Sequence, residues 1–201
     1  MSIYIIEHLD AKLGRWSEIE YENISRVVGK KNLLFTNVKD KKDLRKLIKF
    51  GAVSPLRSFL LPFVKNKESK KKICILDPEA KQLLSPKEAE QQDFFIFGGI
   101  LGDYPPRKRT ETELTSKFNL KNKNVIVRNI GKEQMSTDNA VLCVKKIAEG
   151  REFNKLKFKD NLELKFGKFL TMELPYRYNL VNGKPFISRK LLSYLKKKKG
   201  F

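Results

Sequence analysis

Short apolar runs alternate with segments of helical periodicity along most of this chain. The runs are Ile3–Ile6, Leu33–Phe35, Ile73–Leu76, Phe94–Phe97 and Asn124–Val127. Between them, apolar residues recur at the spacing of a helix, as they do from Trp16 to Val28. Strands that alternate with helices form parallel sheets whose two faces are both covered. The sequence therefore predicts an α/β fold with a mostly parallel sheet.

Start and stop signals place the helices between these strands. The first helix contains Trp16 and ends near Gly29, and a short one is expected around Leu44 to Ile48. Ser54-Pro55 is expected to open another helix. The apolar face of that helix would be Leu56, Phe59, Leu60 and Phe63, interrupted by Pro62. Ser136-Thr137-Asp138 is expected to cap a further helix whose inner face runs from Ala140 to Ala148.

The last quarter of the chain has a different pattern. Leu162 to Tyr178 is strand-like, and Asn182-Gly183 is a strong hairpin signal. Leu191 to Leu195 begins a terminal helix that runs into Lys196 to Lys199, which we expect to be a solvated basic tail. We predict one domain over residues 1–160 and a β-rich extension over 161–201, made of a hairpin and a basic helix.

The net charge of +20 is the most unusual property of the composition. It arises from 43 lysines and arginines against 23 aspartates and glutamates. Such an excess attracts RNA, DNA or ribosomes before any specific contact forms. Heat adaptation also enriches charged residues, so the charge alone leaves both explanations open.

The two cysteines, Cys74 and Cys143, both lie in apolar surroundings without CxxC spacing. This pattern argues against a metal cluster and against a secreted disulfide scaffold. No apolar run approaches the roughly 20 residues of a membrane span, and the start of the chain lacks the basic region of a signal peptide. We expect a cytoplasmic protein that binds neither a metal ion nor a membrane.

The stretch from Glu88 to Pro106 contains no lysine or arginine, although cations are frequent elsewhere. Its carboxylates are Glu88, Glu90, Asp93 and Asp103. Within it, the apolar run Phe94–Phe97 leads into Gly98-Gly99-Ile100-Leu101-Gly102. The glycine spacing matches neither a dinucleotide-binding fingerprint nor a phosphate-binding P-loop. Glycines let backbone pack closely around an organic ligand, and the lack of cations suits a ligand that carries positive charge.

A second loop lies between the last predicted parallel strand and its helix, from Asn129 to Asp138. Its free amides and hydroxyls could bind a carboxylate or ribose oxygens. Alternatively, Ser136 or Thr137 only caps the helix. Because both loops follow parallel strands, we predict that they form one pocket, and that this pocket is free of cations.

Three segments of the chain resemble the SPOUT class of S-adenosylmethionine-dependent methyltransferases. They are Phe97–Thr110, Gln134–Val141 and Glu173–Tyr178, and Ile6–Leu9 and Leu76–Pro78 also fit. The branch that the chain resembles contains an arginine methyltransferase of a small-subunit ribosomal protein and archaeal relatives labelled RNA methyltransferases. The resemblance covers nearly the whole chain. It implies a deep trefoil knot around residues 94–150, which ordinary topology rules would not predict.

The resemblance also implies that S-adenosyl-L-methionine binds between the two loops. The positions that carry over as cofactor-binding are Asp77, Gly98, Gly99, Leu101, Gly102, Gln134, Met135 and Thr137. Methyl transfer requires alignment of donor and nucleophile and exclusion of water. For an arginine acceptor, a carboxylate must orient the guanidinium and help to remove a proton. The candidates are Asp103, Glu7 and Glu173, although Asp103 could instead stabilise the turn at Gly102.

Substrate contacts depend on the class of acceptor. The candidates are Arg107, Arg109, His8, Tyr176 and Arg177. An arginine in a ribosomal protein is our first hypothesis, and RNA is the alternative, because a basic enzyme repels a basic peptide and attracts RNA. A third hypothesis is a non-catalytic basic protein that binds ribosomes or RNA. We expect a monomer or a homodimer whose partner is a ribosomal protein or subunit.

Overall fold

The computed structural model describes residues 2–66, 68–102, 107–165 and 171–197. The strands are β1 (Ile3–His8), β2 (Leu33–Thr36), β3 (Ala52–Val53), β4 (Ile73–Leu76), β5 (Phe94–Gly99), β6 (Val125–Arg128), β7 (Phe158–Lys165), β8 (Thr171–Val181) and β9 (Lys184–Pro185). The α-helices are α1 (Arg15–Val28), α2 (Lys41–Leu47), α3 (Pro62–Lys65), α4 (Pro86–Glu90), α5 (Arg109–Glu113), α6 (Thr137–Ala148) and α7 (Arg189–Lys197). Short 3₁₀ turns are η1 (Lys30–Asn32), η2 (Ser58–Leu60), η3 (Thr115–Lys117) and η4 (Phe153–Lys155).

The main sheet has six strands in the order β3-β2-β1-β5-β4-β6. All of its strand pairs are parallel, which confirms the predicted α/β class. The register between β1 and β5 places Glu7 opposite Gly98 and His8 opposite Gly99. Parallel strands carry the residues that follow them to one edge of the sheet, so the loops after β4, β5 and β6 meet there.

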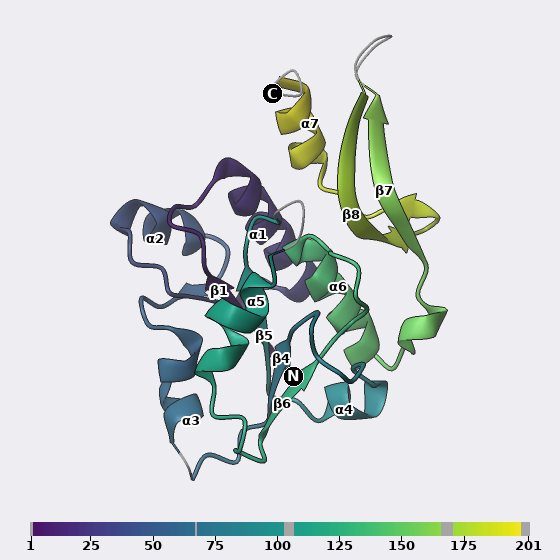
Figure 1. The fold of residues 1–201 in the computed structure, drawn as a ribbon. Coiled ribbons are helices and arrows are strands. Elements are labelled where there is room, and N and C mark those ends of the chain that lie inside the picture. Colours follow the sequence, from purple (N-terminus) through teal and green to yellow (C-terminus); the bar gives the residue numbers. More distant parts are fainter. Residues whose placement is uncertain (1, 67, 103–106, 166–170, 198–201) are drawn as a thin grey trace.

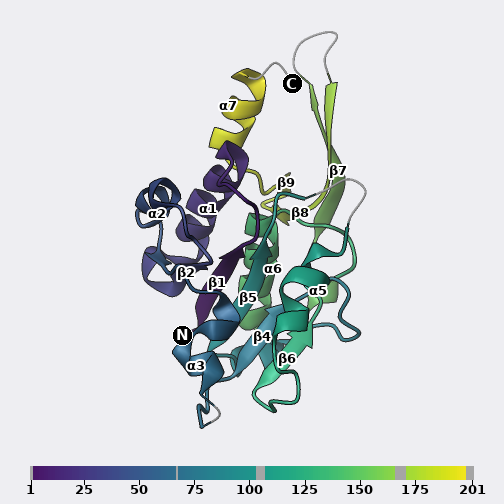
Figure 2. The same cartoon turned by 60° about the vertical axis from the view of Figure 1, so that its left-hand side comes forward.

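Successive side chains of a strand point to opposite faces, so the sheet divides the core into two layers. On one face, Phe95 and Phe97 pack in a cluster with residues of α1 and α6. On the other face, Ile96 packs in a cluster with Leu61 and Leu114, which lie beside α3 and α5. Figures 1 and 2 show the helices on the two sides of this sheet.

The prediction that a helix begins at Ser54-Pro55 is wrong. The amide of Ser54 instead donates to the carbonyl of Phe35 at 2.8 Å, beside the short strand β3, and the chain bends at Pro55 and Leu56. Of the apolar residues that suggested a helix, Leu56 lies in a bend, Phe59 and Leu60 belong to η2, and Phe63 belongs to α3. Pro62 forces this division, since the residue before a proline avoids helical angles and Leu61 is extended.

A second sheet holds β7, β8 and β9, which pair antiparallel. The strand-like stretch Leu162 to Tyr178 therefore belongs to two strands. Asn182 and Gly183 both have positive φ, 51° and 75°, as the predicted hairpin turn requires. The hairpin and α7 stand together at one end of the molecule (Figures 1 and 2). Residues of β8 and α7 form a third apolar cluster with Ile19 of α1.

The domain boundary at residue 160 and the knot both stay predictions. Among the described residues, none of the helices has the length and apolar character that a membrane span requires. Cys74 and Cys143 are free and buried, as expected for small core residues.

Candidate active site

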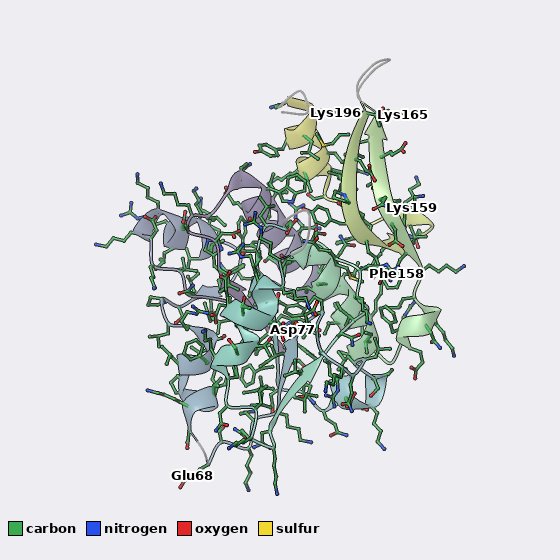
Figure 3. The ribbon with its side chains drawn as sticks, viewed as in Figure 1. Glu68, Asp77, Phe158, Lys159, Lys165 and Lys196 are labelled. Carbon is green, nitrogen blue, oxygen red and sulfur yellow. The ribbon has the colours of Figure 1, made fainter. Side chains whose placement is uncertain are left out.

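A cavity of about 180 Å³ lies at the carboxyl edge of the main sheet. Its wall is built from the loops that follow β4, β5 and β6 and from the start of α5. The two loops that we expected to form one pocket both contribute, through Gly98 and Gly102 on one side and Gln134 to Thr137 on the other. Asp77 comes from the loop after β4, and Figure 3 shows it near the middle of the molecule.

The cavity is not free of cations, which corrects the sequence prediction. Arg107, Lys108, Arg109 and Lys132 all line it. The stretch before Arg107 has no cations along the chain, but the fold brings the start of α5 and the loop after β6 to the same wall. Internal ion pairs reduce the positive charge: Lys108 lies 2.7 Å from Glu79 and Arg109 lies 2.9 Å from Asp10.

Glycine at position 102 lets the two loops approach each other. A Cβ atom on Gly102 would overlap the side-chain amide of Gln134 and the ring of Tyr176. The Oε1 atom of Gln134 is buried and has no hydrogen-bond partner among the described residues. A buried acceptor without a partner is costly. The cavity wall therefore offers a hydrogen-bond acceptor to a ligand.

The other predicted cofactor positions divide into two groups. Asp77, Met135 and Thr137 line the cavity. Asp77 is already engaged, because its carboxylate accepts from the Thr115 hydroxyl at 2.5 Å and from the Glu79 amide at 3.0 Å.

Gly99 and Leu101 do not line the cavity. Gly99 packs against α1, where a Cβ atom would overlap the hydroxyl of Tyr21. Leu101 is exposed, and its amide donates to Asp10 at 2.9 Å. These two residues therefore hold the loop in place from outside the cavity.

The predicted catalytic carboxylates lie away from the cavity or beyond the described structure. Asp103 is outside the described residues, so its role stays a prediction. Glu7 is fully buried and accepts from the Arg57 side chain and from the backbone amide of Ser58 at 2.6 Å, which fixes η2 to β1. Glu173 is exposed on β8, opposite Glu163 of β7. We therefore assign a structural role to Glu7, whereas Glu173 does not line the cavity.

The sequence analysis missed two carboxylates that line the cavity, Glu79 and Glu133. Glu79 is paired with Lys108, and Glu133 lies 2.6 Å from Arg177. Each lies just after the carboxyl end of a strand of the parallel sheet, and this position in the sequence could have identified both as site residues. Among the described residues, no group of three or more His, Cys, Asp or Glu side chains is placed to hold a metal ion.

The predicted substrate residues are mostly engaged within the chain. Arg107 and Arg109 line the cavity, and Arg109 donates to Glu113 at 2.7 Å in addition to its pair with Asp10. His8 is buried behind the wall, 3.1 Å from the hydroxyl of Tyr21. Burial lowers the pKa of His8. His8 is therefore a structural residue in this fold.

Strand β8 holds both cavity loops. The Tyr176 hydroxyl donates to the carbonyl of Gly102 at 3.2 Å. The amide of Arg177 donates to the carbonyl of Gln134 at 2.8 Å, and its guanidinium contacts Glu133 and Asp160. The extension thus positions the loops, and we describe Tyr176 and Arg177 as positioning residues.

A buried pair of acidic residues lies behind the second loop. Glu20 of α1 accepts from the Trp16 indole at 2.6 Å and from the Thr137 amide at 3.3 Å. Asp138 accepts from Asn23 at 2.7 Å and from the hydroxyl of Ser136, also at 2.7 Å. Ser136 precedes α6 as predicted, but no hydrogen bond from its side chain caps the helix. Burial and the nearby Asp138 raise the pKa of Glu20 to about 8.

Comparison with known proteins identifies relatives over the full length. The family described as protein arginine N-methyltransferase SFM1-like matches residues 3–200. Protein arginine N-methyltransferase SFM1 of Saccharomyces cerevisiae is 38% identical over 205 residues, which cover 96% of this chain and 94% of the relative.

Solved structures show the same relationship. The yeast arginine methyltransferase SFM1 complexed with SAM has a TM-score of 0.85 and 36% identity, covering 100% of this chain and 92% of that one. The dual specific Trm10 from Thermococcus kodakaraensis has a TM-score of 0.59 at 17% identity, covering 77% of this chain and 96% of that one. At this identity the likeness to Trm10 concerns the fold alone.

Proposed function

The chain belongs to the SFM1-like family of protein arginine N-methyltransferases, and on this premise we propose that it methylates an arginine side chain of a ribosomal protein. It is an S-adenosyl-L-methionine-dependent methyltransferase. The observation that carries the proposal is the cavity in which the two predicted loops meet beside the carboxylates of Glu79 and Glu133. The comparisons do not favour RNA as the acceptor.

The residues of the cavity fit the cofactor. Gly98 and Gly102 line the cavity, and the missing side chain of Gly102 lets Gln134 and Tyr176 pack close to its backbone, while Met135 adds apolar surface. The unpartnered Oε1 of Gln134 would accept a hydrogen bond from an amino group of the cofactor. When bound, S-adenosyl-L-methionine supplies a methyl group on a positively charged sulfur.

Glu79 and Glu133 are suited to receive the acceptor guanidinium. Carboxylates bind a guanidinium with two parallel hydrogen bonds, which fixes its plane. Both side chains are more than a third exposed, at 37% and 51%, so a substrate can reach them. As the new N–C bond forms, the bond between the methyl group and the cofactor sulfur would break, the acceptor nitrogen must lose a proton, and a nearby carboxylate accepts that proton. Lys108 and Arg177 hold these carboxylates until the substrate guanidinium takes their place.

A ribosomal protein is the substrate that the surface charge and the family resemblance support. The net charge of +20 favours association with ribosomal particles. Local carboxylates at the cavity then offset repulsion between the enzyme and a basic peptide. We place the protein in the cytoplasm, where free thiols such as those of Cys74 and Cys143 persist.

We also propose that the chain is knotted, as the resemblance implies. The chain leaves β5 and returns to β6, which pairs with β4 on the far side from β5. Stretching the molecule by its two ends tests this, because a knotted chain reaches a shorter extended length than an open one. Full extension to the unknotted length would exclude the knot.

One incubation tests the choice of acceptor class. Purified small ribosomal subunits are incubated with the protein and S-adenosyl-L-methionine labelled in its methyl group, and the RNA is then separated from the proteins. We expect the label in the protein fraction. Label confined to the RNA would overturn the proposal.

A further inference from the structure

A second hollow, of about 460 Å³, lies between the start of α1 and helix α7. We call it the α1–α7 groove. The residues that give it polar character are Arg15 of α1 and Arg189, Lys190, Ser193, Tyr194 and Lys197 of α7. Among the described residues, none lines both this groove and the cavity of the candidate active site.

The packing of α7 fixes these cations on a rigid surface. Leu191 and Leu195, four residues apart, are buried in the apolar cluster that β8 and α1 complete. The basic residues of α7 therefore point outward, and Lys196 and Lys197 belong to the helix. Both lysines are exposed to solvent, as expected, and they continue the helix, while Lys198 and Lys199 lie outside the described residues.

The groove carries an excess of positive charge. Arg15 lies 3.0 Å from Glu18, and Lys190 lies 2.6 Å from Glu22. Among the described residues, Arg189 and Lys197 have no ion-pair partner. Exposed cations without partners are available to an external anion, and two of them on one helix face suit a chain of regularly spaced phosphates.

We propose that the α1–α7 groove binds the sugar-phosphate backbone of single-stranded RNA. Arg189 and Lys197 contact phosphates, the hydroxyl of Ser193 donates to a phosphate oxygen, and Tyr194 adds an aromatic ring to the same wall. A basic groove with an aromatic side chain is typical of a sequence-tolerant single-strand site. The choice of RNA over DNA rests on the proposed ribosomal substrate.

The position of the groove explains how a basic enzyme can reach a basic substrate. Helix α7 and the hairpin stand beyond the carboxyl edge of the parallel strands, where the active-site cavity lies (Figures 1 and 2). Figure 3 shows Lys196 and Lys165 at this end of the molecule and Glu68 at the opposite end. RNA held in the groove would bring the cavity close to a protein already bound to that RNA.

To test the proposal, the affinity of the protein for a fluorescent, mixed-sequence single-stranded RNA is measured by fluorescence anisotropy over a range of salt concentrations. The double variant Arg189→Gln/Lys197→Gln should bind more weakly than the unchanged protein at every salt concentration. The slope of log K against log salt should fall by about 1.4, since each lost phosphate contact removes about 0.7 for a single strand. The matched control Lys30→Gln/Lys31→Gln changes the same charge at the far end of α1 and should bind as the unchanged protein does.

Equal weakening in both double variants would overturn the proposal, because overall charge would then account for the binding. Unchanged binding by the groove variant would also overturn it. If polyglutamate of equal charge binds more tightly than RNA and loses affinity in the groove variant, the partner is an acidic polypeptide instead. Methyl transfer to a free arginine peptide, measured on the same variants, should be unchanged. A protein that binds RNA through the groove but transfers no methyl group would refute the proposed function alone.

Discussion

Glu133 is the residue whose chemistry matters most for the proposed reaction. Its carboxylate lines the cavity and contacts Arg177, which belongs to the strand that positions the loop. Glu133→Gln keeps the shape of the side chain and removes its charge. We expect methyl transfer to an arginine peptide to fall by about 100-fold, the lower range for loss of a general base, with cofactor affinity unchanged.

Glu173→Gln is the matched control, because Glu173 is exposed on β8 and does not line the cavity. Its rate should equal that of the unchanged protein. A large loss in Glu173→Gln, or none in Glu133→Gln, would contradict the assignment. Glu173 was a candidate because it is a carboxylate in a segment that carries the family resemblance, but a motif does not tell which face of a strand meets a cavity.

The two glycines of the first loop should respond differently to alanine. A Cβ on Gly99 would overlap buried groups of Tyr21 and Ile6, so Gly99→Ala should lower the free energy of unfolding by about 1–3 kcal/mol. A Cβ on Gly102 would displace the side chain of Gln134, so Gly102→Ala should mainly weaken cofactor binding. Thermal melts with and without S-adenosyl-L-methionine separate the two effects. If both variants lost a similar amount of stability in the absence of the cofactor, the proposed difference between Gly99 and Gly102 would be refuted.

Glu20 gives the fold a pH dependence that can be measured. Its pKa is raised from 4.5 to about 8, chiefly by burial and then by Asp138. We assign the neutral form to Glu20, because Asp138 accepts more hydrogen bonds that favour its charged form. Because the pKa of Glu20 is higher in the folded protein, its contribution to the free energy of unfolding is complete below 4.5, its pKa in the unfolded chain. That contribution is lost as the pH rises through about 8, its pKa in the folded protein.

Glu20→Gln should therefore flatten the fall in the free energy of unfolding between pH 4.5 and about 8. Urea unfolding over this range measures it. The lowered pKa of His8 acts in the opposite direction, but it is common to both proteins and cancels in the comparison. Parallel pH profiles for the two proteins would show that Glu20 does not titrate as we infer.

At the scale of elements, helix α6 and strand β8 are joined through Asn139. Its side chain is fully buried, donates to the carbonyl of Phe186 at 3.0 Å and accepts from the amide of Asn179 at 2.8 Å. Asn139→Ala should lower the free energy of unfolding by about 2–3 kcal/mol, because buried partners lose their hydrogen bonds. Asn119 is exposed, so Asn119→Ala should change the free energy of unfolding little. Urea denaturation of the two variants measures the difference. Equal stability of the two variants would show that the junction is not required.

The elements that the sequence predicted correctly are those with a strong periodic signal. The buried strands are continuous apolar runs, and α1 has its apolar residues at helical spacing. Helix α5 was missed because its sequence, Arg109 to Glu113, contains no apolar residue. The helix at Ser54 was predicted in error, since helical spacing of apolar residues also fits two short turns around a proline.

At the scale of the whole molecule, the sequence predicted which loops meet but not which charged side chains surround them. A parallel sheet brings the loops after its strands to one edge, so Gly102 and Gln134 could be placed together. The cations of α5 and the carboxylates of Glu79 and Glu133 reach the same wall through tertiary contacts that no local pattern encodes. The engagement of Arg109 with Asp10 is likewise a contact between distant parts of the chain.

In the proposed reaction, an arginine guanidinium receives a methyl group in this cavity. Ribosomal proteins labelled by the purified enzyme can be hydrolysed to amino acids and separated by chromatography against standards. We predict that the label elutes as methylarginine and that Glu133→Gln strongly reduces it. Label recovered as methyl-lysine, or lost on mild base as a methyl ester would be, would contradict the claim.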